Sequence, residues 1–119
     1  MLTYFFLFQN ILFSNQLFSE LHDFGEIENS NINEASGICS SKKNSNVLWT
    51  HNDSGDYNRI FAISLEGKHL GEYYLNNSKN RDWEDIAIGP GPIKGETYLY
   101  IGDIGDNLSI YNKSGLEII

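Results

Sequence analysis

The sequence predicts an all-β fold: a partial β-propeller of about one and a half four-stranded antiparallel blades, with a repeat of about 50 residues. The first observation is that the stretch Glu84–Asn107 matches the chain 50 positions earlier. Glu84 falls on Glu34 and Asp103 on Asp53, with no gap over about 30 positions. The second observation is that each copy consists of short apolar segments separated by polar or Gly-containing turns. The third is that no helical periodicity is visible in either copy, so a propeller blade fits both period and pattern.

The first repeat, residues 34–80, is predicted to form one complete blade. Its apolar or alternating segments have the length of strands, and turns separate them. The turn Glu66-Gly67-Lys68 has glycine where a tight turn needs a positive φ. The strands are expected at Ala35–Ser40, Val47–His51, Arg59–Leu65 and His69–Leu75.

The second repeat, residues 84–119, is predicted to be incomplete. Its first two strands end at Asp103, and Ser109–Tyr111 would begin the third. Because each blade buries its apolar face on a neighbour, such a piece leaves sheet faces and edges uncovered. We therefore expect an N-terminal fragment of a longer propeller, or a chain that oligomerises to cover its open blade edges.

The first 20 residues are strongly apolar and are predicted to be a signal peptide or hydrophobic leader, so residues 21–119 form the incomplete propeller. The apolar run is too short and too interrupted, by Gln9 and Asn10 among others, for a stable membrane span. The predicted location is therefore secreted, periplasmic or at the cell surface, and the cytoplasm is the alternative if the leader is no export signal. After the leader, His22–Glu28 alternates weakly and is a candidate strand.

Composition excludes several classes of function. The 119 residues carry a formal net charge of −8, whereas nucleic acids and anionic membranes attract a positive field. The single Cys39 excludes an intrachain disulfide and any multi-cysteine metal site. It lies in an apolar run, and we expect a buried, inert thiol there.

Acidic residues recur where the blades change direction. In a four-stranded antiparallel blade, the segment leading into the first strand and the loop after the second strand lie at the same end. Oxygen ligands gathered at such a rim suit a hard cation such as Ca²⁺. The predicted metal ligands are Asp53, Asp56, Glu84, Asp85, Asp103 and Asp106. Weaker candidates at the same rim are Glu34, His51, Asn52, Asp82 and Asn107.

Ordinary turn chemistry is the alternative interpretation of these carboxylates. In Asp-x-Gly-Asp, the aspartates accept backbone N–H bonds and the glycine supplies positive φ. The spacing does not match the twelve-residue EF-hand loop. His51 is expected at the same rim as a hydrogen-bond partner rather than a base, and no catalytic residue is assigned. The large aromatic side chains predicted to wedge between blades are Trp49, Trp83, Tyr98 and Tyr100.

Four stretches carry a resemblance to a known family: E-A-S-G-I, L-W-T-H-N-D-S-G-D, R-D-W-E-D-I-A-I-G-P-G and Y-L-Y-I-G-D-I-G-D-N. They resemble bacterial, mostly exported β-propeller proteins of largely unknown function, which are similar to the NHL, strictosidine-synthase-like and phytase-like six-bladed propellers. The resemblance covers about Glu34–Asn107 and implies a longer parent. Phytase-like relatives imply Ca²⁺-dependent phosphoester hydrolysis, but the Lys/Arg-rich phosphate pocket of that chemistry is not visible here.

Two functions follow from these observations. The first is a binding or scaffold propeller whose acidic rim holds Ca²⁺ and an unknown polar ligand or protein partner. The alternative is a fragment of a Ca²⁺-dependent hydrolase, similar to the phytase-like phosphoesterases, whose remaining catalytic residues lie on other blades. We expect this chain by itself not to be an active enzyme.

Overall fold

The structure is a computed structural model that describes residues 20–106, 109 and 115–119. These residues form two antiparallel sheets, and none of them is helical, which confirms the predicted all-β class. The predicted leader and Asn107 lie outside the described residues. The strands are β1 (Ala35–Ser40), β2 (Val47–Asn52), β3 (Arg59–Ser64), β4 (His69–Tyr74), β5 (Trp83–Pro90), β6 (Thr97–Asp103) and β7 (Gly115–Ile118).

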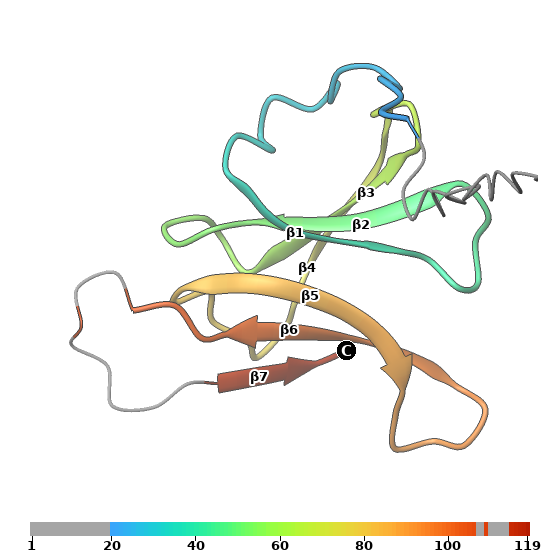
Figure 1. Cartoon of the computed structure of the whole chain (residues 1–119). Helices are drawn as coiled ribbons and strands as arrows, with labels where there is room; N and C mark the ends of the chain where they lie inside the picture. The colour runs from blue at the N-terminus through green and yellow to red at the C-terminus, as the bar shows by residue number, and fades with distance from the viewer. Residues whose placement is uncertain (1–19, 107–108, 110–114) are drawn as a thin grey trace, which may run out of the picture.

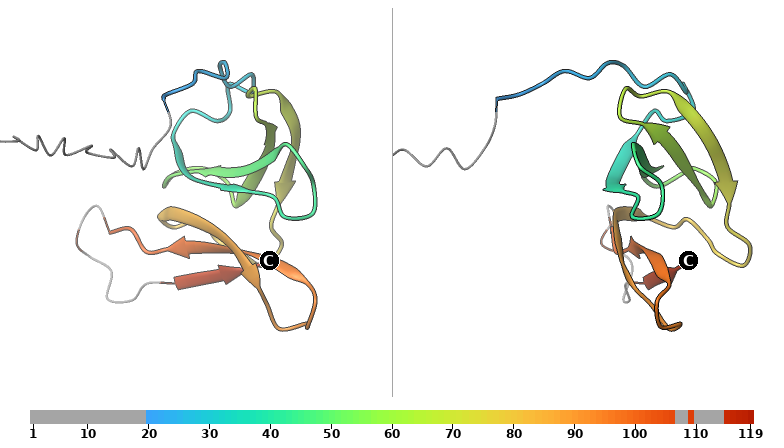
Figure 2. Two further views of the ribbon diagram at one scale, coloured as in Figure 1. Left: turned by 45° about the vertical axis from the view of Figure 1, so that its right-hand side comes forward. Right: turned by 90° about the vertical axis from the view of Figure 1, so that its right-hand side faces the viewer.

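The two sheets are blade-like meanders in which consecutive strands pair. The first sheet has the order β1-β2-β3-β4, and the second has the order β5-β6-β7 (Figure 1). The first strands of both, β1 and β5, lie against each other, and the sheets stack face to face (Figure 2). Pro90 ends β5, which is an edge strand, so its missing N–H costs the sheet no ladder bond.

Strand positions agree with expectation to within about one residue wherever turns delimit them. Val47–Asn52, Arg59–Ser64 and His69–Tyr74 each differ from the predicted range by a single end residue. The third strand of the second repeat was expected to begin at Ser109–Tyr111 and is observed at Gly115–Ile118. Ser109 lies in a bend, and residues 110 and 111 are outside the described residues. Among the described residues, no helix is long and apolar enough to cross a membrane.

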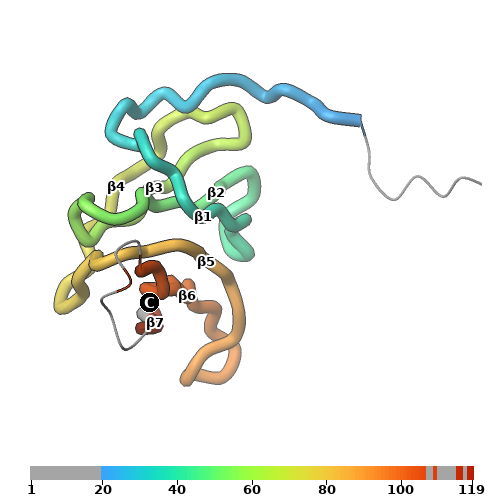
Figure 3. The backbone as a smooth tube through the Cα atoms, turned by 60° about the vertical axis from the view of Figure 1, so that its left-hand side comes forward, coloured from blue at the N-terminus to red at the C-terminus, as the bar shows by residue number. Residues whose placement is uncertain are grey.

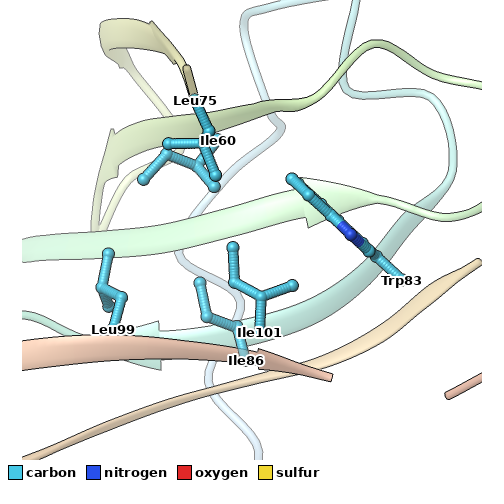
Figure 4. Packing of buried hydrophobic residues seen from close by; sticks show 6 residues of the cluster. All are labelled: Ile60, Leu75, Trp83, Ile86, Leu99 and Ile101. Atoms are coloured by element: carbon cyan, nitrogen blue, oxygen red, sulfur yellow. The ribbon is translucent and has the colours of Figure 1, made fainter. Parts of the chain in front are cut away.

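The main core lies between the two sheets. Alternation along the strands directs one face of each sheet toward the other, and the facing side chains interdigitate. Trp83 is fully buried here, and Cys39, Trp49 and Ile88 pack against the same cluster. The predicted wedging of Trp49 and Trp83 between blades is therefore confirmed. Figure 4 shows the buried cluster, which consists of Ile60, Leu75, Trp83, Ile86, Leu99 and Ile101.

A second, smaller core covers the opposite face of the first sheet. Ile32 packs there with Phe61 and Ile63, and residues 20–33 run past the turn between β3 and β4 before they enter β1 (Figure 3). Glu28 N donates to the Gly67 carbonyl at 2.9 Å, which anchors this segment to the turn. The candidate strand His22–Glu28 is wrong, because the segment makes isolated bonds to a turn rather than a ladder.

The structural repeat has a different register from the gap-free match. Each sheet begins with a β-bulge, at Ser36 in β1 and at Glu84 in β5, so these two residues are equivalent and lie 48 positions apart. On the second strands, Asn52 and Asp103 occupy equivalent places and lie 51 positions apart. The hairpin of the second repeat is therefore longer, and the prediction that the repeats align without a gap is wrong.

This shift decides which side chains face the core. Leu99 and Ile101 point toward the first sheet, whereas Tyr98 and Tyr100 point to the other face and are only half-buried. Tyr98 and Tyr100 were also expected to wedge between blades, and they do not lie between these two sheets.

The close contact of the two sheets depends on a glycine in β1. A Cβ at Gly37 would lie 2.8 Å from Ile86 N and 2.9 Å from His51 Nε2, both of which are held in the interface. We predict that Gly37→Ala lowers the free energy of unfolding by about 1–3 kcal/mol, because the sheets must move apart. Urea denaturation of the purified protein measures this change.

Gly89→Ala is the matched control, since Gly89 lies in β5 and its nearest neighbour to an added Cβ is the Tyr100 ring at 3.5 Å. This variant should unfold within about 0.5 kcal/mol of the unmodified protein. If both substitutions lowered the free energy of unfolding equally, the close contact between the sheets would not be the reason why position 37 requires glycine.

Candidate functional site

The loops after β2 and β6 lie at one end of the stacked sheets, together with the segments that lead into β1 and β5. Asp53 N donates to the Glu34 carbonyl at 2.9 Å, and Gly105 N donates to the Asp82 carbonyl at 3.1 Å. These bonds tie each loop to the start of its own sheet. The two Asp-x-Gly-Asp loops therefore share one rim, as the sequence predicts.

Two of the predicted candidates hold this rim together by hydrogen bonds. Asn52 Oδ1 accepts a bond from Glu34 N at 3.3 Å, and at the equivalent place Asp103 Oδ1 accepts one from Asp82 N at 2.9 Å. Asp103 also pairs with Arg81, whose Nε lies 3.4 Å from Asp103 Oδ1. Asn52 and Asp103 thus have the same structural role, and neither joins the group of carboxylates that converge on the rim.

Three carboxylates do converge, from Asp53, Asp82 and Glu84. One oxygen of each lies within 4.8 Å of the others. Asp82 is only 2 % exposed, while Asp53 and Glu84 are half-buried. Asp53 follows the first sheet and Glu84 belongs to the second, so the group spans the junction between them.

Contacts between the two bulges position Glu84. Ser36 Oγ donates to the Glu84 carbonyl at 3.0 Å and approaches Glu84 Oε2 at 3.4 Å. A bulge redirects the side chain of its extra residue, and here two equivalent bulges meet across the sheet interface. The role of Ser36 cannot be predicted from a sequence motif, because it depends on the meeting of two bulges that are far apart in the sequence.

The loop after β6 closes over the group. A Cβ at Gly105 would clash with Asp82 Cγ and with Glu84 Oε1, so the loop can approach both carboxylates only because residue 105 is glycine. On the other side, Asn80 Nδ2 donates to the Asp53 carbonyl at 3.2 Å, and Ser54 N donates to Asp53 Oδ1 at 2.6 Å. The positions of the three side chains are thus set by surrounding backbone.

Several predicted ligands lie elsewhere. Asp85 Oδ1 accepts a bond from its neighbour Ile86 N at 2.8 Å, and its side chain is exposed. Asp106 is half-buried outside the group, and its carbonyl accepts a bond from Ser109 N at 2.9 Å. Glu34 is exposed and lines a separate polar pocket with Asp56. Asp85 thus accepts a backbone N–H bond, but it does so within strand β5 and not in a turn.

Asp56 forms an ion pair instead of joining the group. Arg59 Nη2 lies 2.7 Å from Asp56 Oδ1, the two side chains are 10 % and 11 % exposed, and Asn52 Nδ2 donates to Asp56 Oδ2 at 2.8 Å. Burial alone would raise the pKa of Asp56, but bonds from Arg59, Tyr57 N and Asn52 outweigh it and lower the pKa. Arg59 also pairs with Glu72 at 3.0 Å, and these bonds raise the pKa of the guanidinium.

His51 does not face the rim, which corrects the expected position. Its ring is completely buried between the sheets, edge-on to Trp83 with ring centroids 5.7 Å apart. Nδ1 donates to the Asn52 carbonyl at 2.8 Å, which confirms a hydrogen-bonding role. Cys39 is half-buried, and burial, followed by the charge of Asp85, raises the pKa of its thiol.

Comparison with known proteins gives no match, whether to a protein-family model, to a curated protein or to a solved structure.

The Asp56–Arg59 pair generates a prediction about stability. We expect Asp56→Asn to lower the free energy of unfolding by about 3 kcal/mol, because it leaves a buried guanidinium whose remaining acidic partner among the described residues is Glu72. Glu72→Gln, which removes one bond from a more exposed side chain, should cost about 1 kcal/mol or less. Thermal or urea unfolding at pH 7 measures both, and equal effects would contradict the prediction.

The pH dependence provides a second readout of the same pair. The lowered pKa of Asp56 means that its stabilising effect is complete above the pKa of an unfolded aspartate, about 3.9, and is lost as pH falls through the folded value. The stability difference between the unmodified protein and Asp56→Asn should thus be constant above about pH 5 and shrink below about pH 4. A difference that is unchanged down to pH 3 would contradict this.

Proposed function

We propose that the chain is a cation-dependent binding module whose rim holds a divalent cation of the Ca²⁺ type at Asp53, Asp82 and Glu84. The observation that supports it most is the convergence of three carboxylates at a site where one of them, Asp82, is almost completely buried. Like charges this close repel one another, and a bound cation would offset the repulsion.

The spacing of the oxygens is compatible with Ca²⁺. Ligands of Ca²⁺ lie 2.3–2.6 Å from the ion, so two of them can be about 5 Å apart. Three oxygens within 4.8 Å of one another can therefore all reach one such ion.

Three carboxylates would leave coordination positions open. Ca²⁺ takes six to eight oxygen ligands, so carbonyls, water or an external ligand would complete the shell. An ion held at the rim could thus present free positions to an anionic or polar partner, which is the role that we assign to the module. Among the described residues no observation favours the hydrolase alternative, whose remaining catalytic residues would lie on other blades.

The proposed setting is outside the cytoplasm, as the apolar leader suggests. Extracellular modules bind Ca²⁺ with dissociation constants of about 10⁻⁴–10⁻³ M, because the ion is abundant there. A site with three acidic ligands and incomplete coordination belongs to this weak range.

The prediction is a thermal shift. We expect the melting temperature of the protein to rise in millimolar Ca²⁺ and to fall again with chelator, because an ion that binds only the folded chain stabilises it by RT ln(1 + [Ca²⁺]/Kd). At ten times Kd this is about 1.4 kcal/mol, or a few degrees for a domain of this size. Differential scanning fluorimetry with and without Ca²⁺ measures it.

Asp82→Asn and Glu84→Gln should each abolish the response. Asp85→Asn is the matched control, since Asp85 is an exposed carboxylate of the same strand as Glu84 and contacts its own neighbour's amide. It should respond to Ca²⁺ as the unmodified protein does. A melting curve indifferent to Ca²⁺ and chelator, or a response that Asp85→Asn removes equally, would overturn the proposal.

A further inference from the structure

A small pocket opens between the two sheets at the end opposite to the acidic rim. It has a volume of about 150 Å³, and its lining includes Trp49, Ile88, Leu99 and Ile119. Leu99 pairs with Ile88 near one end of the second sheet, whereas Trp83 lies at the other end of β5. Figure 4 shows Leu99 and Trp83 at opposite ends of the buried cluster. The pocket is therefore an open end of the inter-sheet core.

The inner walls of the pocket are apolar. Leu99 is 8 % exposed and belongs to the core cluster, and Trp49 and Ile88 pack against that cluster. Ile119 exchanges two backbone hydrogen bonds with Leu99, at 2.8 and 2.9 Å, so the two residues lie opposite each other and share one face of the sheet. An apolar cavity of about 150 Å³ is large enough to bind benzene. The walls and the volume thus suit a single ring.

Trp49 makes an aromatic ring the better fit. Its side chain is half-buried, and the ring of Tyr73 packs edge-on against it with centroids 5.6 Å apart, which restricts its position. Aromatic rings that meet edge to face or in an offset stack attract each other beyond the effect of the area that they bury. An aromatic ligand would therefore find a fixed aromatic wall in the pocket.

The outer lining of the pocket is polar. Ser41, Lys43 and Asn44 come from the turn between β1 and β2, and Thr97 begins β6. Ser41 Oγ accepts a hydrogen bond from Asn44 N at 3.1 Å, and its hydroxyl can still donate one to a ligand. Ligand pockets combine apolar walls with a few polar groups that fix the orientation of the ligand. A matching ligand would thus carry a hydrogen-bonding group beside its ring.

Charge restricts the ligand further. Lys43 is the one charged residue among the described lining residues, and its Nζ lies 2.5 Å from Glu96 Oε2 in the turn between β5 and β6. A cationic ligand would meet Lys43. An anionic ligand would have to displace Glu96, in a chain whose net charge is −8. The surroundings therefore favour a neutral ligand.

We propose that this pocket binds a small uncharged aromatic molecule, of about one ring, that carries a hydroxyl or amide group. The ring would pack between Trp49 of the first sheet and Ile88 and Leu99 of the second, and the polar group would lie beside the turns. This inference does not depend on the cation site, which lies at the other end of the sheets.

Nuclear magnetic resonance on the full chain tests the proposal, with benzyl alcohol as the probe. The chain has two tryptophans, and Trp49→Phe identifies which indole N–H signal belongs to Trp49. We expect a saturable shift of that signal, with a dissociation constant on the order of 1 mM, as suits so small a ligand. Benzoate and benzylammonium have the same ring but carry a charge, so they should bind at least about tenfold more weakly.

Thr97→Phe should weaken the binding of benzyl alcohol at least about tenfold, because Thr97 lies on the same strand face as Leu99 and an added ring fills the pocket. Ile93→Phe is the matched control, since Ile93 is 62 % exposed in the adjoining turn and is not among the lining residues. It should bind as the unmodified chain does, and circular dichroism should show both variants folded.

Glu96→Gln is a second variant, which keeps the size of the side chain and removes the acidic partner of Lys43. It should strengthen the binding of benzoate roughly threefold. The absence of a saturable shift at about ten times the expected dissociation constant would overturn the proposal. Equal binding of the three probes, an unchanged affinity of folded Thr97→Phe for benzyl alcohol, or an unchanged affinity of Glu96→Gln for benzoate would overturn it too, since the probe would then bind elsewhere.

Discussion

Burial of Trp83 between the two sheets is the constraint on which the acidic rim depends. Its side chain is completely buried in the inter-sheet core, and it is flanked in the chain by Asp82 and Glu84. Once the indole is fixed, both neighbours must leave the core at the junction of the sheets, and Asp53 approaches them from the first sheet. The geometry of the carboxylates is therefore a consequence of apolar packing at the next position.

The packing works against the charges that it assembles. Carboxylate oxygens of Asp53, Asp82 and Glu84 lie within 4.8 Å of one another, and like charges this close oppose the packing that gathers them. Asp56 lies in a different environment, because Arg59 pairs with it.

The sequence was sufficient for strands β1 to β6 and for the common rim, because alternation, glycine turns and antiparallel pairing are local properties, but it misplaced β7 and suggested a strand at His22–Glu28 that is absent. It was not sufficient for the side-chain faces. In the structure, Ser36 is equivalent to Glu84, 48 positions later, and Asn52 is equivalent to Asp103, 51 positions later. The identical residues of the two motifs, by contrast, match at a distance of 50 positions. Since strand faces alternate at every residue, a difference of one position in the register decides which face Tyr98 and Tyr100 occupy. Arg59, three positions after Asp56, was the local signal for the ion pair.

The corrected register separates the acidic residues of the rim into two kinds. Asn52 and Asp103 each accept a hydrogen bond from the backbone N–H of the residue that precedes the sheet. An uncharged side chain in the first repeat and a carboxylate in the second thus have the same structural role. The carboxylate version has Arg81 beside it, as a charge in that place requires. The second kind consists of the carboxylates that meet across the sheet junction, those of Asp53, Asp82 and Glu84. The loop after β6 can lie close to them because residue 105 is glycine. The aspartate-rich motifs therefore contain side chains that bind backbone N–H groups as well as one group of converging carboxylates. Only the pairing of the strands shows to which of the two a given residue belongs.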